Sequence, residues 1–296
     1  MILALTGATG FVGSHLLDLA LAEGHQVRAL TRRPQGDRPG VTWVSGDLGD
    51  TAALAILVEG AEVVVHVAGV VNATDRAGFM RGNMEGTRAM VAASAGKRFV
   101  HVSSLAAREP QLSDYGWSKA EAERIVTESG LDWTIVRPTG VYGPRDSEMR
   151  EMFRMAQRGV VLLPPRGRVS LIAVEDLARL LLAIAIRGGS RAILEADDGS
   201  AGYSHADLAH ALGRAVGRRA RAMHMPAMAL RLAARADMRR RGPRAKLTLD
   251  RVAYLVHPDW TADPALRPSP ALWQPRVALD AGLAATAAWY RAEGLL

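Results

Sequence analysis

The chain has no cysteine among its 296 residues. This absence excludes a disulfide framework and a metal site built on thiolates, and it is compatible with a reducing compartment. The sequence also has no run of about 18 apolar residues, the length that a membrane-spanning helix needs. Its apolar N-terminus has no basic region in front of it and so does not match a secretory leader. We therefore expect a cytoplasmic protein without a metal site.

Charge is distributed unevenly along the chain. Hydrophobic residues make up 49% of it and charged residues 23%, a balance that suits one or two globular domains with an ample core. The formal net charge is +7, and segment 214–251 alone holds twelve Arg or Lys against Asp237 and Asp250. The rest of the chain is slightly acidic, so the basicity belongs to this one C-terminal segment.

Within the basic segment, apolar and basic side chains recur at helical spacing on different sides, which is the pattern of a basic amphipathic helix. The apolar set is Met225, Met228, Ala229, Leu232 and Ala236, and the basic set is Arg231, Arg235 and Arg239. Such a helix is either a solvated flank of a domain or a peripheral contact with anionic lipid. No aromatic interleaving or nucleic-acid motif accompanies the charge, so we expect no nucleic-acid partner.

The beginning of the chain joins a strand to a helix through three glycines. An apolar run, Ile2 to Leu5, precedes Gly7, Gly10 and Gly13, and an amphipathic stretch from Phe11 to Ala22 follows. In this context the first glycine makes a tight turn, the second lets the backbone approach a pyrophosphate, and the third lets the helix pack on the strand. The free N–H groups of the helix then face the phosphates. The sequence predicts a dinucleotide site in its first turn.

Strand and helix signals alternate through the first half of the chain, which predicts a doubly wound parallel sheet of the Rossmann type in an α/β fold. The expected strands after the first are Gln26–Thr31, Val41–Val44, Glu62–Val67, Arg98–Ser103 and Asp132–Arg137. Later pieces are a helix near Ser147–Arg158, a strand near Arg168–Ile172, a helix at Val174–Ile186, a short strand ending at Ala196, a helix at Ser204–Val216 and a Pro-rich stretch from Pro258 to Pro275.

This order predicts two domains. Residues 1–165 form the dinucleotide-binding domain, with a return segment near 168–196, and residues 197–296 form a smaller, mostly helical substrate lobe. We expect the lobe to close over the carboxyl edge of the sheet, where ligands bind in open parallel sheets.

An acid–base site is predicted at strand ends in the middle of the chain. Ser103 and Ser104 end the strand RFVHVSS, and Tyr115 and Lys119 lie four residues apart in YGWSK, hence on one face of a helix. A tyrosine with a pKa near 10 is a poor proton shuttle at neutral pH, but an adjacent ammonium lowers that pKa. We expect Lys119 to lower the pKa of Tyr115 and to reach the cofactor ribose.

The order of these motifs over about residues 1–190 resembles the short-chain dehydrogenases/reductases of the extended or atypical kind, the group of epimerases, dehydratases and 3β-hydroxysteroid dehydrogenases. The motifs are TGATGFVG, Asp47-Leu48, HVAG from His66 to Gly69, NMEGT from Asn83 to Thr87, VSS, YGWSK, RPTGVYGP from Arg137 to Pro144, and VEDLA from Val174 to Ala178. The resemblance implies that Tyr115 exchanges a proton with a carbonyl or hydroxyl oxygen, that a serine bonds the same oxygen, and that Lys119 binds the ribose. Ser104 is favoured over Ser103, because the last serine of the run usually corresponds to the catalytic one.

The resemblance also implies a set of cofactor-binding residues: Gly7, Thr9, Gly10, Phe11, Val12, Gly13, Arg32, Asp47, Leu48, Ala68, Gly69, Lys119 and Pro138. Asp47 would contact the adenine, or else be an ordinary turn residue. Asn83 would either cap a helix or help to hold a catalytic water. We expect His66 and His101 to be strand residues rather than ligands, and Asp176 to cap a structural turn.

The cofactor is predicted to be NADPH, with NADH left open. An acid at the end of the second strand binds the ribose 2′-OH of NADH, whereas an arginine accommodates the 2′-phosphate of NADPH. Here Thr31 stands at the expected acid position and is followed by Arg32 and Arg33. The alternative is that both arginines point to solvent.

The substrate is predicted to be an apolar ketone or alcohol. Sugar-nucleotide members of the family typically have VYG after the serines and an asparagine before the later VYGP, where this chain has LAARE and Gly140. Met223, Met225, Met228 and Met238 offer adaptable apolar surface, although methionines at this spacing are more often core. The C-terminal pieces HPDW, LWQPR and GLAATAAWYRAEGLL are similar to tails of bacterial members linked to lipid metabolism.

The most specific hypothesis is a ketoreductase of sphingolipid type that acts on the 3-keto group of a long-chain amide. Two alternatives stay open: a sugar-nucleotide epimerase or dehydratase, and a non-catalytic NADPH-binding accessory or sensor protein. The sequence also leaves open a homodimer and a peripheral association with the inner membrane.

Overall fold

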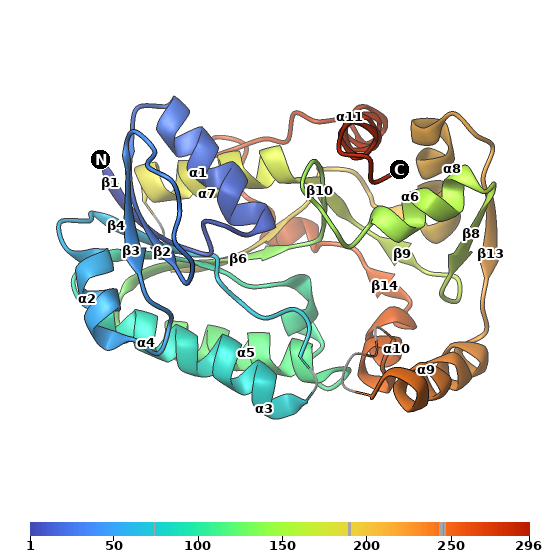
Figure 1. The fold of residues 1–296 in the computed structure, drawn as a ribbon, viewed down its shortest axis with the longest axis horizontal. Coiled ribbons are helices and arrows are strands. Elements are labelled where there is room, and N and C mark those ends of the chain that lie inside the picture. Colours follow the sequence, from blue (N-terminus) through green and yellow to red (C-terminus); the bar gives the residue numbers. More distant parts are fainter. Residues whose placement is uncertain (74, 189–190, 243–244, 246) are drawn as a thin grey trace. The chain divides into compact units, whose positions relative to one another are not determined.

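The computed structural model describes the chain except for residues 74, 189–190, 243–244 and 246 (Figure 1). The chain forms two compact units, each assembled from separate stretches. The first contains Met1–Pro138, Leu177–Ala196 and Ala265–Gln274, and the second contains Thr139–Asp176, Asp197–Pro264 and Pro275–Leu296.

The first unit is built on a seven-stranded sheet in the order β11-β6-β5-β4-β1-β2-β3, in which all neighbouring strands are parallel. Its strands are β1 (Ile2–Thr6), β2 (Gln26–Thr31), β3 (Val41–Ser45), β4 (Val63–His66), β5 (Arg98–Val102), β6 (Asp132–Pro138) and β11 (Ala192–Ala196). All four residues of β4 are buried, as is typical of strands covered on both faces. The predicted doubly wound parallel sheet is confirmed.

Helices cover both faces of this sheet: α1 and α7 lie on one face, and α2, α4 and α5 on the other (Figure 1). The helical elements are α1 (Phe11–Ala22), α2 (Thr51–Val58), α3 (Arg76–Phe79), the π-helix η1 (Met80–Glu85), α4 (Gly86–Ala93), the 3-10 helix η2 (Leu105–Arg108), α5 (Asp114–Thr127) and α7 (Val174–Arg187). Leu54, Leu57, Met90 and Val126 pack with Phe99 of β5 in the core beneath the second face.

The strand order reverses at β1. From there the chain runs outward through β2 and β3, and then crosses back so that β4 pairs with the other side of β1, with Thr6 opposite His66. In open parallel sheets, the carboxyl ends of the strands at such a switch point form the ligand-binding crevice. Thr6 and His66, the last residues of β1 and β4, therefore mark the place for the site.

Among its described residues, the second unit combines three small sheets with five α-helices. The sheets pair β7 (Gly140–Tyr142) with β10 (Leu171–Ala173), β8 (Val160–Leu163) with β13 (Arg221–His224), and β9 (Arg168–Val169) with β12 (Tyr203–Ser204) and β14 (Asp259–Trp260). The helices are α6 (Arg150–Gln157), α8 (His205–Val216), α9 (Ala227–Arg241), α10 (Leu249–Leu255) and α11 (Leu279–Ala292), and the short 3-10 helix η4 spans Pro264–Leu266. The core contains Tyr142, Phe153, Leu212, Leu283 and Tyr290.

Asp176 has a structural role in the second unit, as predicted. Its buried carboxylate Oδ2 accepts hydrogen bonds from the backbone N–H groups of Arg276 and Val277, at 2.8 and 2.9 Å. These bonds fix the chain where it enters the turn before α11.

The prediction of one strand at Arg168–Ile172 is wrong, because β9 and β10 belong to different sheets. Ser170 separates them. Its hydroxyl donates to Asp197 and accepts from the N–H of Ala262, both at 3.2 Å, so that it bonds to other segments of the chain.

The compact units divide the chain at other positions than the predicted domains 1–165 and 197–296. Residues 139–165 belong to the second unit, since β7 pairs with β10 instead of widening the large sheet. Residues 177–196 bring most of α7 and all of β11 to the first unit, and the predicted domain boundaries stay a prediction. The substrate role of the second unit stays a prediction.

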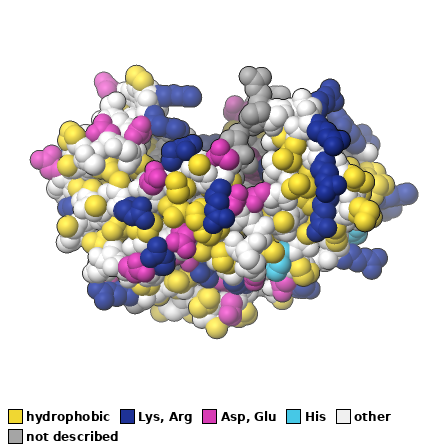
Figure 2. All heavy atoms as spheres, turned by 90° about the horizontal axis from the view of Figure 1, so that it is seen from below, with side chains coloured by type: hydrophobic (Ala, Val, Ile, Leu, Met, Phe, Trp, Pro, Cys, Tyr) yellow, Lys and Arg dark blue, Asp and Glu magenta, His cyan; other side chains and the backbone are white. Residues whose placement is uncertain are grey.

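Of the four methionines predicted to offer adaptable apolar surface, three are exposed, and the alternative that they belong to the core is wrong for these three. Met223, Met228 and Met238 are exposed, and Met225 is half-buried. Figure 2 shows hydrophobic side chains beside a column of Lys and Arg at the right of the view, over the part of the surface formed by α9. Within the described residues, no helix combines the length and apolar character needed to cross a membrane.

Candidate active site

The glycine turn after β1 is closely packed against the loop that follows β4. Gly7 has φ +76°, and a Cβ at this position would lie 2.8 Å from the backbone nitrogen of Ala68. A Cβ at Gly13 would lie 2.0 Å from the carbonyl oxygen of Gly7, so α1 packs directly on the turn. Both positions therefore require glycine. Gly7 has a positive φ and lies against the backbone of Ala68, whereas Gly13 lies against the carbonyl of Gly7.

The N-terminus of α1 has the features of an anion site. Gly10 is its N-cap and provides no side-chain hydrogen bond, and the first turn has no acidic residue. Helix N–H groups at this end have no partner within the helix, and the helix dipole favours negative charge there. Thr9 and Gly10 are exposed, and Phe11 and Val12 are half-buried. This cradle fits the pyrophosphate of a dinucleotide.

A buried hydrogen-bond chain joins β1, β4 and α4 beneath the crevice. The His66 ring bonds through Nδ1 to the Thr6 hydroxyl at 2.7 Å and through Nε2 to the Thr87 hydroxyl at 3.2 Å, and Thr6 also accepts from the N–H of Ala68 at 3.2 Å. Burial, and then the charge of Lys119, lower the pKa of His66 to about 3. A neutral His66 thus fixes the loop that carries Ala68.

His101 is also neutral and buried. It lies in β5, where its ring stacks on that of His66 with centroids 5.4 Å apart. Burial, Lys119 and His66 together lower its pKa well below the usual value. Both histidines are strand residues, as predicted.

Asn83 does not cap a helix, contrary to one of the two expectations for it. It lies buried within the π-helix η1, where its Oδ1 accepts from the N–H of Val70 at 2.7 Å. Its Nδ2 donates to the carbonyl of Val70 at 3.0 Å and to the Ser118 hydroxyl at 2.9 Å. The side chain therefore joins the segment after Gly69 to α5, and its expected part in holding a water stays a prediction.

Ser104 and Tyr115 lie at the N-terminal ends of two helices, η2 and α5, and their side chains meet. Ser104 follows β5 and caps η2 by accepting from the N–H of Ala106 at 3.2 Å, and Ser113 caps α5 by accepting from the N–H of Gly116 at 3.0 Å. This places Tyr115 in the first turn of α5, where its hydroxyl forms a side-chain hydrogen bond with Ser104. Both residues are half-buried and hence partly accessible.

Burial raises the pKa of the Tyr115 phenol, and the hydrogen bond with Ser104 opposes this only in part. The phenol is therefore protonated at neutral pH. The expected net lowering of this pKa is not found in the chain by itself, because desolvation of the phenolate outweighs the favourable contacts. The influence of Lys119 on the phenolate stays a prediction. A protonated tyrosine beside a hydroxyl is arranged to give a proton to an oxygen atom.

Lys119 lies one turn further along α5 and is buried. Its ammonium donates to the carbonyl of Val102, the last residue of β5, at 2.8 Å. Burial lowers the pKa of Lys119 to about 8, and the charge of Glu123 acts in the opposite direction. At neutral pH most of the lysine is therefore charged.

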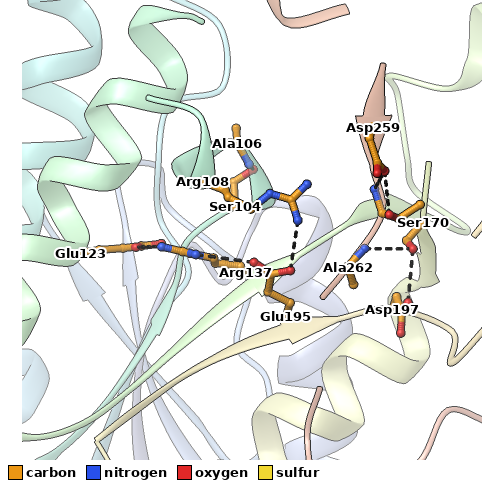
Figure 3. A network of polar contacts seen from close by, with 11 residues as sticks. Ser104, Ala106, Arg108, Glu123, Arg137, Ser170, Glu195, Asp197, Asp259 and Ala262 are labelled. Carbon is orange, nitrogen blue, oxygen red and sulfur yellow. Dashed lines mark hydrogen bonds and ion pairs between the residues drawn. The ribbon is translucent and has the colours of Figure 1, made fainter. Parts of the chain in front are cut away.

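A buried ion-pair network lies next to these residues and was missed by the sequence reasoning (Figure 3). Ser103 donates to Glu123 at 2.5 Å, so its hydroxyl is engaged away from Tyr115. Arg137 of β6 pairs with Glu123 at 2.6 Å and with Glu195 of β11 at 3.5 Å, and Arg108 of η2 also reaches Glu195 at 3.5 Å. One signal was present in the sequence, because Glu123 follows Lys119 by four residues on the same helix face.

The remaining predicted cofactor residues lie at the ends of neighbouring strands. Arg32, after β2, is exposed, as is Asp47, after β3; the carboxylate of Asp47 accepts from the N–H of Gly49 at 2.8 Å and so forms a turn. Leu48 packs against Gly86 at the start of α4. Pro138 is the buried last residue of β6. The roles of these residues toward a cofactor stay predictions.

Comparison with known proteins shows the family to which the chain belongs. A family model described as NAD(P)H-binding matches residues 7–186. The chain belongs to the NAD(P)H-binding short-chain dehydrogenase/reductase family. The predicted family resemblance is thereby confirmed.

Relatives of this short-chain dehydrogenase/reductase include a ceramide reductase from Caulobacter vibrioides, 36% identical over 306 aligned positions that cover 100% of this chain and 96% of the relative. A UDP-glucose 4-epimerase from Vibrio cholerae is 29% identical over 60% of this chain and 64% of its own length. Among solved structures, gox2253 is 24% identical with a TM-score of 0.76, covering 100% of this chain and 99% of that one. WbmH from Bordetella bronchiseptica in complex with NAD+ is 21% identical, with a TM-score of 0.74 and 99% of each chain covered.

The two solved structures share the fold. The family model and the full-length relative identify this short-chain dehydrogenase/reductase as an enzyme that uses a nicotinamide dinucleotide. The cradle formed by Gly7, Gly10 and Gly13 fits that cofactor.

Proposed function

We propose that this enzyme reduces a ketone on a long-chain amide lipid of the ceramide type, with NADPH as its reductant. The observation that carries the chemistry is the hydrogen-bonded pair of Ser104 and Tyr115, with the phenol protonated at neutral pH. The substrate class is supported by the relation to a ceramide reductase along the whole chain. The departures from the sugar-nucleotide motifs, LAARE after Ser104 and Gly140 before VYGP, point in the same direction.

The cofactor would lie across the carboxyl ends of β1 to β6. Gly7, Thr9, Gly10, Phe11, Val12 and Gly13 would hold the pyrophosphate, Asp47 and Leu48 the adenine, and Ala68, Gly69, Lys119 and Pro138 the ribose and nicotinamide end. Arg32 would bind the 2′-phosphate of NADPH, because it is exposed directly after β2 and no acidic residue stands at Thr31.

When bound, the reduced cofactor supplies a hydride to the carbonyl carbon of the substrate. Tyr115 donates its hydroxyl proton to the carbonyl oxygen, so that hydride and proton together convert the ketone to an alcohol. The Ser104 hydroxyl orients that oxygen and remains hydrogen-bonded to it as negative charge develops. Positioned proton donation of this kind typically contributes about 10²- to 10⁴-fold to the rate.

Lys119 acts after Tyr115 has given up its proton. Its ammonium stabilises the Tyr115 phenolate until solvent returns a proton. Two contacts prepare it for this role: the carbonyl of Val102 fixes its position, and the nearby Glu123 carboxylate favours its charged form. A neutral Lys119 would leave the phenolate without a counter-charge.

We further propose that the basic segment 214–251 brings the enzyme into peripheral contact with the inner membrane from the cytoplasmic side, where an amide lipid with long chains resides. Arg244 and Lys246 of this segment lie outside the described residues.

The test is NADPH oxidation by the purified protein with detergent-dispersed 3-keto amide lipids, a steroid ketone, small ketones and nucleotide sugars in parallel. We expect consumption with the keto lipids alone. Conversion of a nucleotide sugar without net NADPH consumption would instead identify an epimerase. Tight NADPH binding with no turnover across the panel would identify a cofactor-binding accessory or sensor protein.

A further inference from the structure

The outward face of α9 carries apolar side chains in its first half and basic ones in its second. Met228 and Leu232 are 74% and 58% exposed, and Arg235 and Arg239 are exposed as well. Met228 and Leu232 are four residues apart, about one helical turn, and so are Arg235 and Arg239. The second pair follows the first by seven residues, about two turns, so all four side chains share one face of the helix. We call these four residues the α9 face.

The opposite side of α9 attaches the helix to the rest of its unit. Ala234 is buried there, and Leu230 and Asp237 are half-buried. Asp237 pairs with Arg241 at 3.2 Å and accepts from the N–H of Leu247 at 3.0 Å. The α9 face is therefore the outer side of an anchored helix and has no role in its own unit's core.

The surroundings of the α9 face add positive charge. Arg231 lies to one side of it, and Arg239, Arg240 and Arg241 follow each other at the end of the helix, all of them exposed. Within α9 the one acidic residue is Asp237, on the attached side. In Figure 2, Lys and Arg side chains stand in a column beside exposed hydrophobic ones over this helix.

We propose that the α9 face docks on an anionic lipid surface, with Met228 and Leu232 entering the boundary between headgroups and acyl chains and the arginines binding lipid phosphates. An interfacial helix combines an exposed apolar strip with basic residues in this way. Arginine stems lie along apolar surface while their guanidinium groups reach the headgroups. Nucleic acid would use the charge but not the exposed Met and Leu, so the lipid surface is favoured.

This inference deepens the proposed function by naming the surface on which the enzyme meets a lipid substrate, but vesicle binding can be measured without turnover. The full-length protein is floated with vesicles of phosphatidylcholine alone and of phosphatidylcholine mixed with phosphatidylglycerol in equal parts. We expect binding to the anionic vesicles only, weakened by salt, because screening reduces the attraction of exposed charges.

Two double variants divide the contribution of the α9 face. Arg235→Gln with Arg239→Gln should weaken binding to anionic vesicles about 25-fold, since each arginine near such a surface contributes about fivefold. Met228→Ser with Leu232→Ser should also release the protein while leaving its charge unchanged. The matched control combines Ile56→Ser and Arg88→Gln, which change an exposed apolar side chain and an exposed arginine on α2 and α4; it should bind like the original protein.

Insertion is tested separately, and the absence of cysteine makes the labelling unique. An environment-sensitive fluorophore on Leu232→Cys should shift to shorter wavelength when anionic vesicles are added, whereas the same fluorophore on Ile56→Cys should not. An unshifted label at position 232 would overturn the insertion of Leu232.

Equal binding of both vesicle types, no binding to either, or unchanged binding by both double variants would overturn the docking proposal. Capture of an acidic protein in place of vesicles would do the same. Reductase activity on detergent-dispersed lipid distinguishes the two proposals: the α9 variants should retain it, and its absence in a protein that still binds vesicles would overturn the proposed substrate but not the docking surface.

Discussion

Glu123 accepts hydrogen bonds from two nitrogens of the same guanidinium, Nε and Nη2 of Arg137, at 2.9 and 2.6 Å. Bidentate pairs of this kind are strong and fix geometry. Glu123 also accepts a hydrogen bond from the Ser103 hydroxyl, and it lies one helical turn after Lys119 in α5. Through Arg137 and Ser103, Glu123 therefore connects β6 and the segment after β5 with the helix that carries Tyr115 and Lys119.

The first prediction concerns Glu123→Gln and the pH dependence of the reaction. Lys119 acts as an ammonium, so kcat/KM should fall as pH rises through its pKa of about 8, well before Tyr115, whose pKa burial has raised, loses its proton. Glu123 raises the pKa of Lys119, and its neutral replacement lowers it. The alkaline decline of kcat/KM should therefore begin at lower pH in the variant.

Glu195→Gln is the matched control, because Glu195 is buried in the same network and pairs with Arg137 but is not among the groups that shift the pKa of Lys119. Removing one partner of a buried pair typically costs about 3–5 kcal/mol, so both variants should have a lower free energy of unfolding. Only Glu123→Gln should move the pH profile. Identical profiles in the two variants would reduce Glu123 to a structural role.

The two adjacent serines should respond differently to replacement by alanine. Ser104 bonds with Tyr115, whereas the Ser103 hydroxyl is engaged with Glu123. Ser104→Ala should lower kcat by about 10²-fold or more, the usual cost of losing a hydrogen bond to a developing oxyanion. Ser103→Ala should lower the unfolding temperature and leave most of kcat. The reverse pattern in steady-state kinetics and thermal melts would exchange the two assignments.

Local patterns predicted the elements that hold the cofactor crevice. The glycine spacing and the apolar run before it gave α1 at Phe11–Ala22, and the β-rich run QVRALT gave β2 at Gln26–Thr31. The YxxxK spacing placed Tyr115 and Lys119 on one helix. Each of these features depends on residues within a few positions of one another, so the sequence carries them directly.

Features that depend on distant partners could not be read in the same way. Whether β9 and β10 form one strand is decided by Ser170, which bonds to segments 27 and 92 residues away. The Arg137–Glu195 pair spans 58 residues. The pKa of Tyr115 depends mainly on how deeply the fold buries its hydroxyl. The spacing of the tyrosine and the lysine in the sequence contains no information on this burial.

Tyr115→Phe tests the proton donor. The phenol supplies the proton to the carbonyl oxygen, so its loss should reduce kcat by about 10²- to 10⁴-fold. The cofactor cradle lies at the start of α1, and NADPH should still bind with nearly unchanged affinity, measured by fluorescence titration. Turnover at the original rate would remove Tyr115 from the acid role, and loss of NADPH binding would show that the substitution disturbs more than the proton transfer.

Arg32→Ala tests the preference for NADPH. An arginine beside the 2′-phosphate stabilises NADPH and has no corresponding group on NADH, so the KM for NADPH should rise about tenfold or more while that for NADH changes little. Arg33→Ala is the control, because Arg33 is equally exposed and its backbone bonds to Thr31 through both N–H and carbonyl. Equal effects of Arg32→Ala on both cofactors would mean that Arg32 points to solvent.

Gly7→Ala separates backbone conformation from close packing at the cofactor turn. Gly24 has nearly the same backbone conformation, φ +79° against +76°, but a Cβ there would have no neighbour within 4 Å, whereas at Gly7 it would meet the backbone of Ala68 at 2.8 Å. Gly24→Ala should cost about 1–2 kcal/mol in unfolding free energy and leave cofactor binding intact. Gly7→Ala should cost more and should also abolish NADPH binding, because the loops after β1 and β4 must separate. If the two variants lost equal stability and both bound NADPH, the contact between these loops would not be what shapes the crevice.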